Sequence, residues 1–423
     1  MARTRPTQAA PQPARAAAYG LLNAVLIKHR SLEEALDGVP KAVEARDKAA
    51  AHRIAATALR RYGSLDAALE PWLRRNPPDE VRNALRLGAA EILLLGTPAH
   101  AAVNGSVGLV PKPFAGLVNA VLRRVAEAGV AALEGLDAER LDTPGWLYSA
   151  WQQAYGVGVR SIAAAHWVEA PLDLTLAPGA EPPEGGEQLP NGSWRYPAGT
   201  RVTELAGFAE GRFWVQDAAA ALPAKLLGAR PGELIADLCA APGGKTAQLA
   251  AAGATVVAVE REARRIERLR ANLARLHLEA SVVEADAAEW DGGGQLFDAI
   301  LLDAPCTATG TIRRHPDVPH LKRFKDIASL ATTQRRLLAN AAKLLKPEGR
   351  LVFATCSLQP EEGEAHLAAA AELGLVRHPI RPEEVPGLAH AITRDGGLRT
   401  RPDYWADKGG MDGFFVARFA RAG

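Results

Sequence analysis

The chain has 423 residues, which is too long for one compact core, so two or three domains are expected. Hydrophobic residues make up 48% of the chain and charged residues 23%, as in an ordinary globular enzyme, and no apolar run approaches the roughly 20 residues that cross a bilayer. The 50 basic residues nearly balance 48 acidic ones, which excludes a uniformly cationic nucleic-acid coat and leaves local patches as the only places to bind RNA.

The N-terminal part is predicted to be a basic tail followed by an all-α domain. Residues 1–13 contain Arg, Pro and Ala without an acid and lack the apolar core of a signal peptide, so we interpret them as a disordered tail, with RNA contact as the alternative. Residues 14–130 are rich in Ala, Leu and Arg at helical spacing. In the segment 115–129 the apolar residues form one stripe that a helix bundle would bury: Leu117, Val118, Val121, Leu122 and Val125. Arg123 and Arg124 lie off this stripe, where an exposed helix face and a weak RNA contact explain them equally well.

The rest of the chain is predicted to mix helices and strands. In residues 131–210, short apolar runs alternate with Pro and Gly clusters, which indicates a connector and a small α/β subdomain. From residue 211 to 423, apolar runs typical of strands buried on both faces alternate with helical stretches. This pattern predicts an α/β domain with a parallel, Rossmann-like sheet. A last strand is expected in DGFFVARFA at 412–420.

A glycine-bearing turn is expected to bind a cofactor. Residues 237–246 (DLCAAPGGKT) follow a predicted strand and precede a predicted helix, where glycines let backbone NH groups approach a ligand closely. A phosphate-binding loop of the form GxxxxGK[ST] would need glycine at the position of Cys239, so we reject that interpretation. Glu260 ends the second strand, in the position that binds ribose hydroxyls, and Asp286 follows the third strand, within reach of an adenine edge. A solvated acid at a strand end is the alternative for both.

Two cysteines after successive strands give the sharpest chemical signal. The chain's three cysteines are far apart, with no CxxC pair, so we expect neither disulfides nor a metal site, and a reducing cytoplasm fits best. Asp303 and Cys306 follow the fourth strand of the series, and Cys356 follows the next strand. Because ligands of such folds bind at the carboxyl ends of the strands, the carboxylate and both thiols are expected to face one crevice. A lone cysteine is usually a core filler, but two in these positions favour chemistry.

Together these segments resemble the Sun/Fmu (NSUN-type) family of RNA 5-methylcytosine methyltransferases. The resemblance covers the chain from about residue 211 onward, in VQD at 215–217, DLCAAPGGKT at 237–246, VVAVE at 256–260, DAPC at 303–306, RRHPD at 313–317 and ATCS at 354–357. The N-terminal helices resemble the NusB-like domain of bacterial members that act on 16S ribosomal RNA, in RRYGSLD at 60–66, LRLGAAEILLLG at 85–96, AAVN at 101–104 and GLVNAVLRR at 116–124. This resemblance implies that residues 14–130 form an RNA-binding domain.

The resemblance implies an S-adenosylmethionine-dependent RNA methyltransferase, with 16S ribosomal RNA as the expected substrate. It assigns cofactor binding to Cys239, Ala240, Ala241, Pro242, Gly243, Gly244, Lys245, Glu260, Asp286 and Asp303. It assigns attack on C6 of cytosine to Cys356 and product release to Cys306, although spacing alone does not decide which thiol attacks. Glu260 stands where Asp is common, which keeps the charge, and Ala218 and Ala220 stand where polar residues are common, which leaves fine positioning open.

This chemistry accounts for the residue types. Cytosine C5 is a poor nucleophile, and addition of a thiolate at C6 makes an enamine whose C5 can attack a sulfonium methyl group. Asp303, if protonated, can donate at N3, and Lys245 can place a cation near the base or the thiolate. The base must be extruded or unpaired, so single-stranded RNA is expected. Basic residues beyond the fourth strand are expected to border RNA phosphates, with a solvated loop as the alternative: Arg313, Arg314, His315, Lys322, Arg323 and Lys325.

Other functions remain open at this stage. One is an RNA-binding ribosome-assembly factor with a non-catalytic methyltransferase scaffold, but an inactive site would be expected to have lost Cys306 or Cys356. Another is a tRNA 5-methylcytosine methyltransferase. A DNA cytosine or small-molecule methyltransferase is disfavoured by the basic loop and the NusB-like helices. We expect a monomer without a metal or membrane association, because RNA rather than a second subunit would close the cleft.

Overall fold

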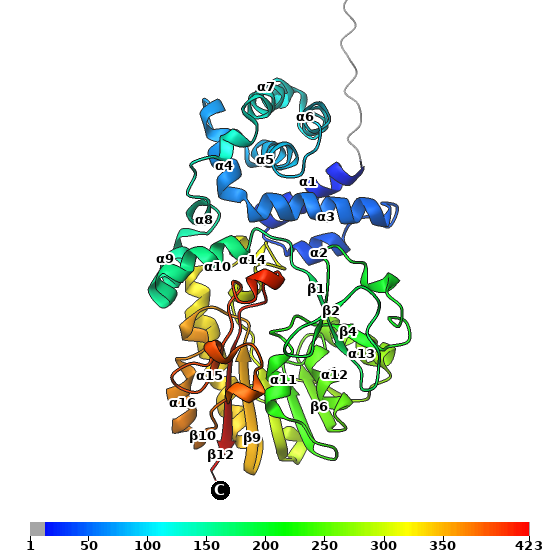
Figure 1. Cartoon of the computed structure of the whole chain (residues 1–423), viewed down its shortest axis with the longest axis vertical. Helices are drawn as coiled ribbons and strands as arrows, with labels where there is room; N and C mark the ends of the chain where they lie inside the picture. Colours follow the sequence, from blue (N-terminus) through cyan, green and yellow to red (C-terminus); the bar gives the residue numbers. More distant parts are fainter. Residues whose placement is uncertain (1–12, 423) are drawn as a thin grey trace, which may run out of the picture. The chain divides into compact units, whose positions relative to one another are not determined.

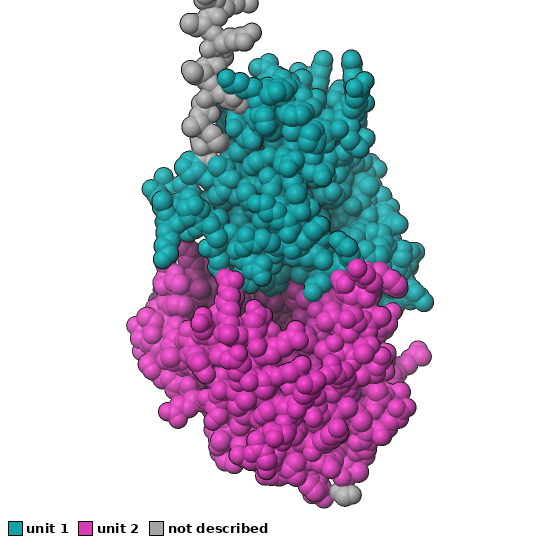
Figure 2. Space-filling view, turned by 180° about the vertical axis from the view of Figure 1, so that it is seen from behind, with its two compact units in different colours: residues 1–167, 315–323 teal, residues 168–314, 324–423 magenta. Residues whose placement is uncertain are grey.

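The computed structural model describes residues 13–422, which fold into two units (Figure 2). Unit 1 runs up to Trp167 and also contains His315–Arg323, whereas unit 2 contains Val168–Arg314 and the chain from Phe324 onward. The predicted basic tail lies outside the described residues except for its last residue, Pro13, which begins the first helix. Within residues 13–422, no helix combines the length and the apolar character needed to span a membrane.

Unit 1 is all-α in its described residues, as the helical spacing predicts. Its helices are α1 (Pro13–Leu26), α2 (Leu32–Asp37), α3 (Ala45–Arg60), α4 (Tyr62–Leu69), α5 (Asp79–Leu93), α6 (Ala99–Val107), α7 (Lys112–Ala128), α8 (Ala138–Leu141), α9 (Gly145–Tyr155), α10 (Val159–Ala165) and α14 (Val318–Leu321) (Figure 1). Val118, Val121, Leu122 and Val125 of the predicted stripe on α7 are at most 2% exposed, whereas Leu117 is half-buried. Helix α7 ends at Gly129, whose φ of +58° is a conformation that residues with a side chain rarely adopt.

A segment from far along the sequence completes unit 1. Asp317 Oδ2 accepts a hydrogen bond at 2.9 Å from the backbone NH of Leu32, one of the NH groups that the start of α2 leaves without a helical partner. His320 Nε2 lies 3.2 Å from the carbonyl oxygen of Leu59, and its ring centroid lies 5.0 Å from that of Tyr62. Burial lowers the pKa of His320 to about 4, so the ring is neutral at neutral pH. Residues 315–323 are therefore a structural part of the helical unit.

Unit 2 is built on a large sheet with strand order β10-β12-β9-β8-β5-β6-β7, to which β11 adds by pairing with β12. The strands are β5 (Leu234–Leu238), β6 (Thr255–Glu260), β7 (Ser281–Glu284), β8 (Phe297–Asp303), β9 (Leu345–Thr355), β10 (Leu375–Arg377), β11 (Leu398–Arg399) and β12 (Phe415–Arg421). Strands β5 to β9 pair in parallel, which confirms the predicted α/β class. The predicted last strand is β12, which pairs antiparallel with β9.

Helices cover both faces of this sheet. They are α11 (Leu222–Leu227), α12 (Gly244–Ala251), α13 (Ala263–Leu276), α15 (Phe324–Leu344) and α16 (His366–Glu372) (Figure 1). In β8, Leu301 packs in one apolar cluster with residues of α11 and α12, whereas Ile300 and Leu302 pack in another with residues of α15 and α16. Such alternation is typical of a strand buried on both faces.

The strand order indicates where a ligand crevice is expected. From β5 the chain adds β6 and β7 on one side and then β8 and β9 on the other. The carboxyl ends of β5 and β8 therefore flank the point where the order reverses. Open α/β sheets bind their ligands at this point.

A small antiparallel sheet precedes the large one in unit 2. Its order is β2-β3-β1-β4, with β1 (Leu172–Leu176), β2 (Glu187–Gln188), β3 (Trp194–Tyr196) and β4 (Phe213–Val215). Helices α8 to α10, which precede these strands, belong to unit 1. The sequence pattern predicts one connector with a subdomain in residues 131–210. The structure divides these residues between the two units, and β4 lies beyond residue 210.

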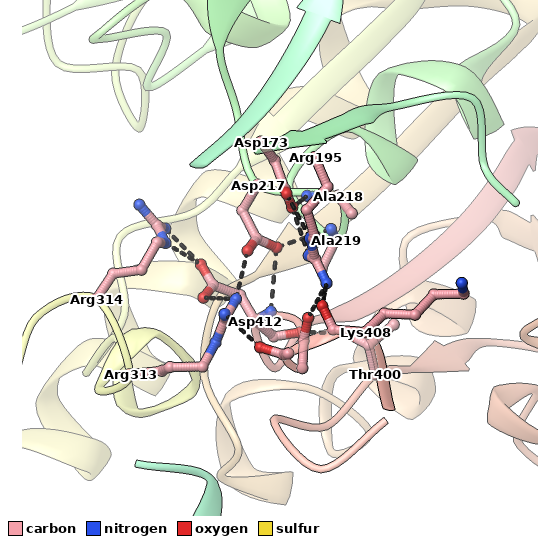
Figure 3. A network of polar contacts seen from close by, with 12 residues as sticks. Asp173, Arg195, Asp217, Ala218, Ala219, Arg313, Arg314, Thr400, Lys408 and Asp412 are labelled. Atoms are coloured by element: carbon pink, nitrogen blue, oxygen red, sulfur yellow. Dashed lines mark hydrogen bonds and ion pairs between the residues drawn. The ribbon is translucent and has the colours of Figure 1, made fainter. Parts of the chain in front are cut away.

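Buried arginines and aspartates join the small sheet to loops of the large one (Figure 3). Arg195 on β3 contacts both carboxylate oxygens of Asp173 on β1 at 2.7 Å, in a bidentate pair. Its Nη1 also donates to the carbonyl oxygens of Lys408 at 2.9 Å and Gly410 at 2.7 Å, in the chain just before β12. The small sheet is therefore fixed to the C-terminal segment of the large one.

Arg313 and Arg314, which follow β8, complete this network. Arg313 Nη2 lies 2.8 Å from Asp217 Oδ2, and Arg314 Nε lies 2.8 Å from Asp412 Oδ2. Burial alone would raise the pKa of Asp217, but the two guanidinium groups outweigh it and lower that pKa. The expectation that Arg313 contacts RNA phosphates is corrected here, because its side chain is 1% exposed and its charge is used inside the protein. The Arg314 side chain, 33% exposed, is likewise paired.

We predict that Arg313→Met lowers the free energy of unfolding by about 3–5 kcal/mol, because it leaves Asp217 buried without its partner. Urea denaturation followed by circular dichroism measures this loss. The matched control is Lys325→Met at an exposed position of α15, which should change stability by no more than about 0.5 kcal/mol. Equal stability of the two variants would show that the ion pair does not hold the fold.

Candidate active site

The predicted cofactor and catalytic residues follow neighbouring strands of the large sheet. The glycine turn comes after β5, Glu260 ends β6, Asp303 ends β8, and Cys356 comes directly after β9. Because β6, β5, β8 and β9 are consecutive parallel neighbours, these strands end at one edge of the sheet. The structure therefore brings together groups that lie up to about 120 residues apart in the sequence, from Asp237 to Cys356.

The turn after β5 has a backbone that few residue types allow. Gly243 adopts φ +103°, and a Cβ there would lie 2.5 Å from Cδ1 of Leu269, so only glycine fits. Cys239 also has a positive φ, of 64°. Thr246 Oγ1 donates a hydrogen bond to Asp237 Oδ2 at 2.6 Å, which fixes the start of α12 to the end of β5. Burial raises the pKa of Asp237 to about 7, and among the described residues no donor is found for its Oδ1.

A pocket beside the ends of β6 and β7 contains Glu260 and Asp286, the two acids predicted to bind a nucleoside. Glu260 is 3% exposed, and its Oε1 accepts hydrogen bonds from the backbone NH groups of Arg261 and Glu262 at 3.0 and 3.3 Å. Its Oε2 accepts none in the described chain, although Arg265 Nη1 lies 3.1 Å away. An oriented carboxylate oxygen that still accepts nothing suits a ribose hydroxyl.

The apolar walls of this pocket were not foreseen from the sequence. Pro305 comes from the loop after β8 and Leu337 from α15, and both line the pocket together with Cys239. Leu337 belongs to the buried stripe of its helix, so its spacing marks it only as a core residue. Burial, reinforced by the negative charge of Glu260, raises the pKa of Cys239 to about 12. Cys239 is therefore a neutral wall of the pocket rather than a nucleophile.

Lys245 and Asp303 form an ion pair between the ends of β5 and β8. Lys245 Nζ lies 2.7 Å from Asp303 Oδ2, with the two side chains 12% and 29% exposed. Burial lowers the pKa of Lys245, but the charges of Asp303 and Cys356 outweigh it, so the pKa is raised and the amine stays protonated. This contact engages Oδ2 of Asp303, the residue predicted to donate to N3 of a base.

Cys306 and Cys356 lie side by side. Their Sγ atoms are 3.4 Å apart, and both thiols are half-buried. The hydrogen bond with Cys356, together with burial, raises the pKa of Cys306 well above its usual range, so Cys306 keeps its proton and acts as the donor. The charge of Cys356 contributes to the raised pKa of both Lys245 and Arg314, which places two cations within electrostatic range of this sulfur. The two thiols are therefore chemically unequal, and the surroundings favour Cys356 as the nucleophile.

Glu362, which the sequence analysis did not single out, links the two cysteine loops. This fully buried carboxylate accepts hydrogen bonds from the backbone NH of Thr307 at 2.9 Å, from its hydroxyl at 2.5 Å, and from the hydroxyl of Ser357 at 2.6 Å. Thr307 follows Cys306 and Ser357 follows Cys356, so one carboxylate fixes both loops. The run EEGE at 361–364 looks like a solvated acidic turn, and only the fold shows that its second acid is buried.

The basic residues predicted to border RNA are divided between the two units. Arg313 and Arg314 are held by the aspartates of unit 2. His315, Lys322 and Arg323 belong to unit 1, where His315 and Lys322 are half-buried and Arg323 is exposed.

Comparisons with known proteins point to one family. The family model described as 16S rRNA methyltransferase RsmB/F matches residues 224–420, and the NusB family model matches residues 12–127. The chain is 36% identical to ribosomal RNA small subunit methyltransferase B of Pseudomonas putida, over 96% of this chain and 98% of that protein. It is 37% identical to the protein of the same name from Vibrio cholerae, over 85% and 89%. The solved structure of a methyltransferase homolog from Pyrococcus horikoshii covers 64% of this chain and 93% of its own, with 26% identity and a TM-score of 0.55.

We predict that iodoacetamide at about pH 8 modifies Cys356 before the other two cysteines, because the thiolate is the reactive form and raised pKa values keep Cys239 and Cys306 protonated. Both should become reactive only as the pH rises toward those pKa values. Cys356→Ala removes the hydrogen bond that contributes most to the raised pKa of Cys306, so this variant should be alkylated at Cys306 faster than the wild type. Mass spectrometry of the peptides gives each rate, and earlier labelling of Cys306 than of Cys356 in the wild type would contradict the assignment.

Proposed function

Since the chain belongs to the ribosomal RNA small subunit methyltransferase B family, we propose that it methylates C5 of a cytidine in 16S ribosomal RNA. Members of this family are S-adenosylmethionine-dependent RNA methyltransferases, and the relationship extends over nearly the whole of this chain. The observation that carries the proposed mechanism is the pair of unequal thiols, 3.4 Å apart, at the ends of adjacent strands.

Groups in unit 2 support the proposed binding of S-adenosylmethionine. The unsatisfied Oε2 of Glu260 fits a ribose hydroxyl, and the apolar walls from Pro305 and Leu337 fit an adenine ring. Asp286 lines the same pocket, and Gly243 keeps the turn after β5 free of a side chain at its closest approach to α13. Bound S-adenosylmethionine supplies an electrophilic methyl group on its sulfonium.

Cys356 is the proposed nucleophile. Its thiolate adds to C6 of the cytosine, which raises the electron density at C5 so that C5 can take the methyl group. The S–H of Cys306 lies 3.4 Å from this sulfur, and the cations Lys245 and Arg314 lie within electrostatic range of it. Addition at C6 moves negative charge onto the ring, and Lys245, paired with Asp303 at the crevice, provides a nearby cation that stabilises this charge.

Cys306 is proposed to assist release. After methylation the proton on C5 leaves to a base, the bond between C6 and the sulfur of Cys356 breaks, and its electron pair returns to that sulfur. The protonated thiol of Cys306 lies 3.4 Å from this sulfur in the described structure and can donate to the thiolate as it departs. The methyl group has moved from the sulfonium to C5, so methylated RNA and S-adenosylhomocysteine leave, neither of them bonded to the protein.

Several finer points complete the proposal. The reacting base must leave its stack to meet Cys356, so the RNA is expected to be single-stranded at the site or to have the base extruded. Three free cysteines suit a reducing cytoplasm. We propose a monomer in which RNA, rather than a second subunit, closes the cleft. An assembly factor without activity is the second candidate, and the intact thiol pair argues against it.

The test is transfer of a labelled methyl group from S-adenosylmethionine to 16S ribosomal RNA from cells that lack this protein, with bisulfite mapping of the product. We expect a single new 5-methylcytosine. Cys356→Ala should abolish transfer and form no covalent adduct, whereas Cys306→Ala should accumulate an adduct with RNA that survives denaturing electrophoresis. Adducts with Cys356→Ala instead would reverse the two roles. Absence of transfer to free RNA and to precursor subunits alike would favour tRNA as substrate or the assembly factor.

We further predict that Glu362 positions both thiols. In Glu362→Gln an amide NH₂ replaces an oxygen that only accepts hydrogen bonds, although Thr307 and Ser357 both donate to this site. The turnover number kcat should fall about 10- to 100-fold, with a much smaller change in KM for RNA, because misplaced reacting groups lose rate rather than affinity. Glu361→Gln, an exposed neighbour, is the matched control. A rise in KM for RNA without a fall in kcat would refute a positioning role, as would equal kcat values for Glu362→Gln and Glu361→Gln.

A further inference from the structure

Unit 1 contains an open groove that the reaction described above does not use. Its volume is about 1100 Å³. One wall runs from Pro71 in η1 (Glu70–Trp72) along the following loop to Pro78, and the other wall is α7. Phe114 and Leu117 line the groove on the α7 side, and Trp72, Arg74 and Arg75 line it on the loop side.

The loop wall is held in place before any ligand binds. Arg82 of α5 contacts Glu70 at 3.2 Å on one side of the loop and Asn76 at 2.5 Å on the other. Pro71, Pro77 and Pro78 also restrict the backbone, because each fixes its own φ. A wall of this kind loses little conformational entropy when a ligand binds.

The side chains of the groove have the chemistry of a site for a nucleic-acid strand. Trp72 is 39% exposed, so part of its large indole ring faces solvent. Arg74 and Arg75 are exposed, and no ion pair with an acid is found for either within residues 13–422. Arg124 on the α7 wall pairs at 3.0 Å with Glu127 but remains 62% exposed. The lining has no acidic residue, because Glu70 is turned to Arg82.

We propose that this groove binds a single-stranded segment of the RNA substrate, with Trp72 stacking on a base and Arg74 and Arg75 contacting phosphates. The combination of exposed cations with an aromatic ring is what single strands need, since phosphates supply charge and unpaired bases supply flat faces. An acidic peptide would match the charges but offers no base for the indole. The proposal deepens the proposed function, on which it rests for the identity of the RNA.

The experiment titrates the full chain into fluorescein-labelled oligouridylate and follows fluorescence anisotropy over a range of salt concentrations. In the double variant Arg74→Gln with Arg75→Gln, loss of two phosphate contacts should make the slope of log K against log salt shallower by about 1.4. Trp72→Ala should weaken binding about tenfold with the slope unchanged, because stacking is not an ionic contact, and Trp72→Phe should restore part of the affinity. The matched control is the double variant of two exposed α3 arginines, Arg46→Gln with Arg53→Gln.

Wild-type affinity and slope in both groove variants would overturn the proposal, as would an equal loss in the α3 control. Displacement of the oligonucleotide by polyglutamate as readily as by unlabelled oligouridylate would overturn it too, because the site would then select only charge. Methyl transfer to 16S ribosomal RNA separates this inference from the proposed function. A wild type that transfers no methyl group removes the proposed function, whereas an active wild type with groove variants of unchanged KM removes only the groove as an RNA site.

Discussion

The pairing of buried carboxylates with buried guanidinium groups is the constraint on which the active loops of unit 2 depend. Three aspartates are matched by three arginines, and removal of any one leaves a charge in a low-dielectric interior. Asp217 follows the small sheet, Asp412 precedes β12, and Arg313 follows the loop of Cys306, so the network joins three separate parts of the chain. The backbone NH of Gly310 in turn donates to the carbonyl oxygen of Cys356 at 3.0 Å, which connects this frame to the nucleophile.

The parts of this arrangement that are local or periodic could be predicted from the sequence. Strands β5, β6 and β8 are mainly apolar because helices cover both faces of the sheet, and each ends at or beside a polar or reactive residue. Parallel strands then place those ends at one edge, so the meeting of Asp303, Cys306 and Cys356 follows from order alone. The helical unit could also be predicted from a periodic pattern, since the apolar stripe of α7 indicates which face of the helix is buried.

The rest could not be predicted because it depends on partners distant in the sequence. Arg313 lies in a run of basic residues that resembles a solvated border, yet its partner Asp217 is 96 residues away and both are buried. His320 belongs to the same stretch but packs against Tyr62 of the helical unit. A charge pattern describes how a segment would behave in water, and it contains no information on which acids the fold will bring to it. Glu362 is a further case, since an acidic turn gives no sign of the four donors around one of its acids.

The three cysteines illustrate the same point within one site. They are the same side chain, and spacing in the sequence does not separate attacker from assistant. Their surroundings do: Cys239 is enclosed beside Glu260, Cys306 donates to a neighbouring sulfur, and Cys356 receives that hydrogen bond with Lys245 in electrostatic range. A thiol becomes a nucleophile where its anion is favoured, so the residues that surround each cysteine decide which one attacks. Glu362 and the arginine–aspartate network hold these surroundings in place, because both fix the loops that contain Cys306 and Cys356.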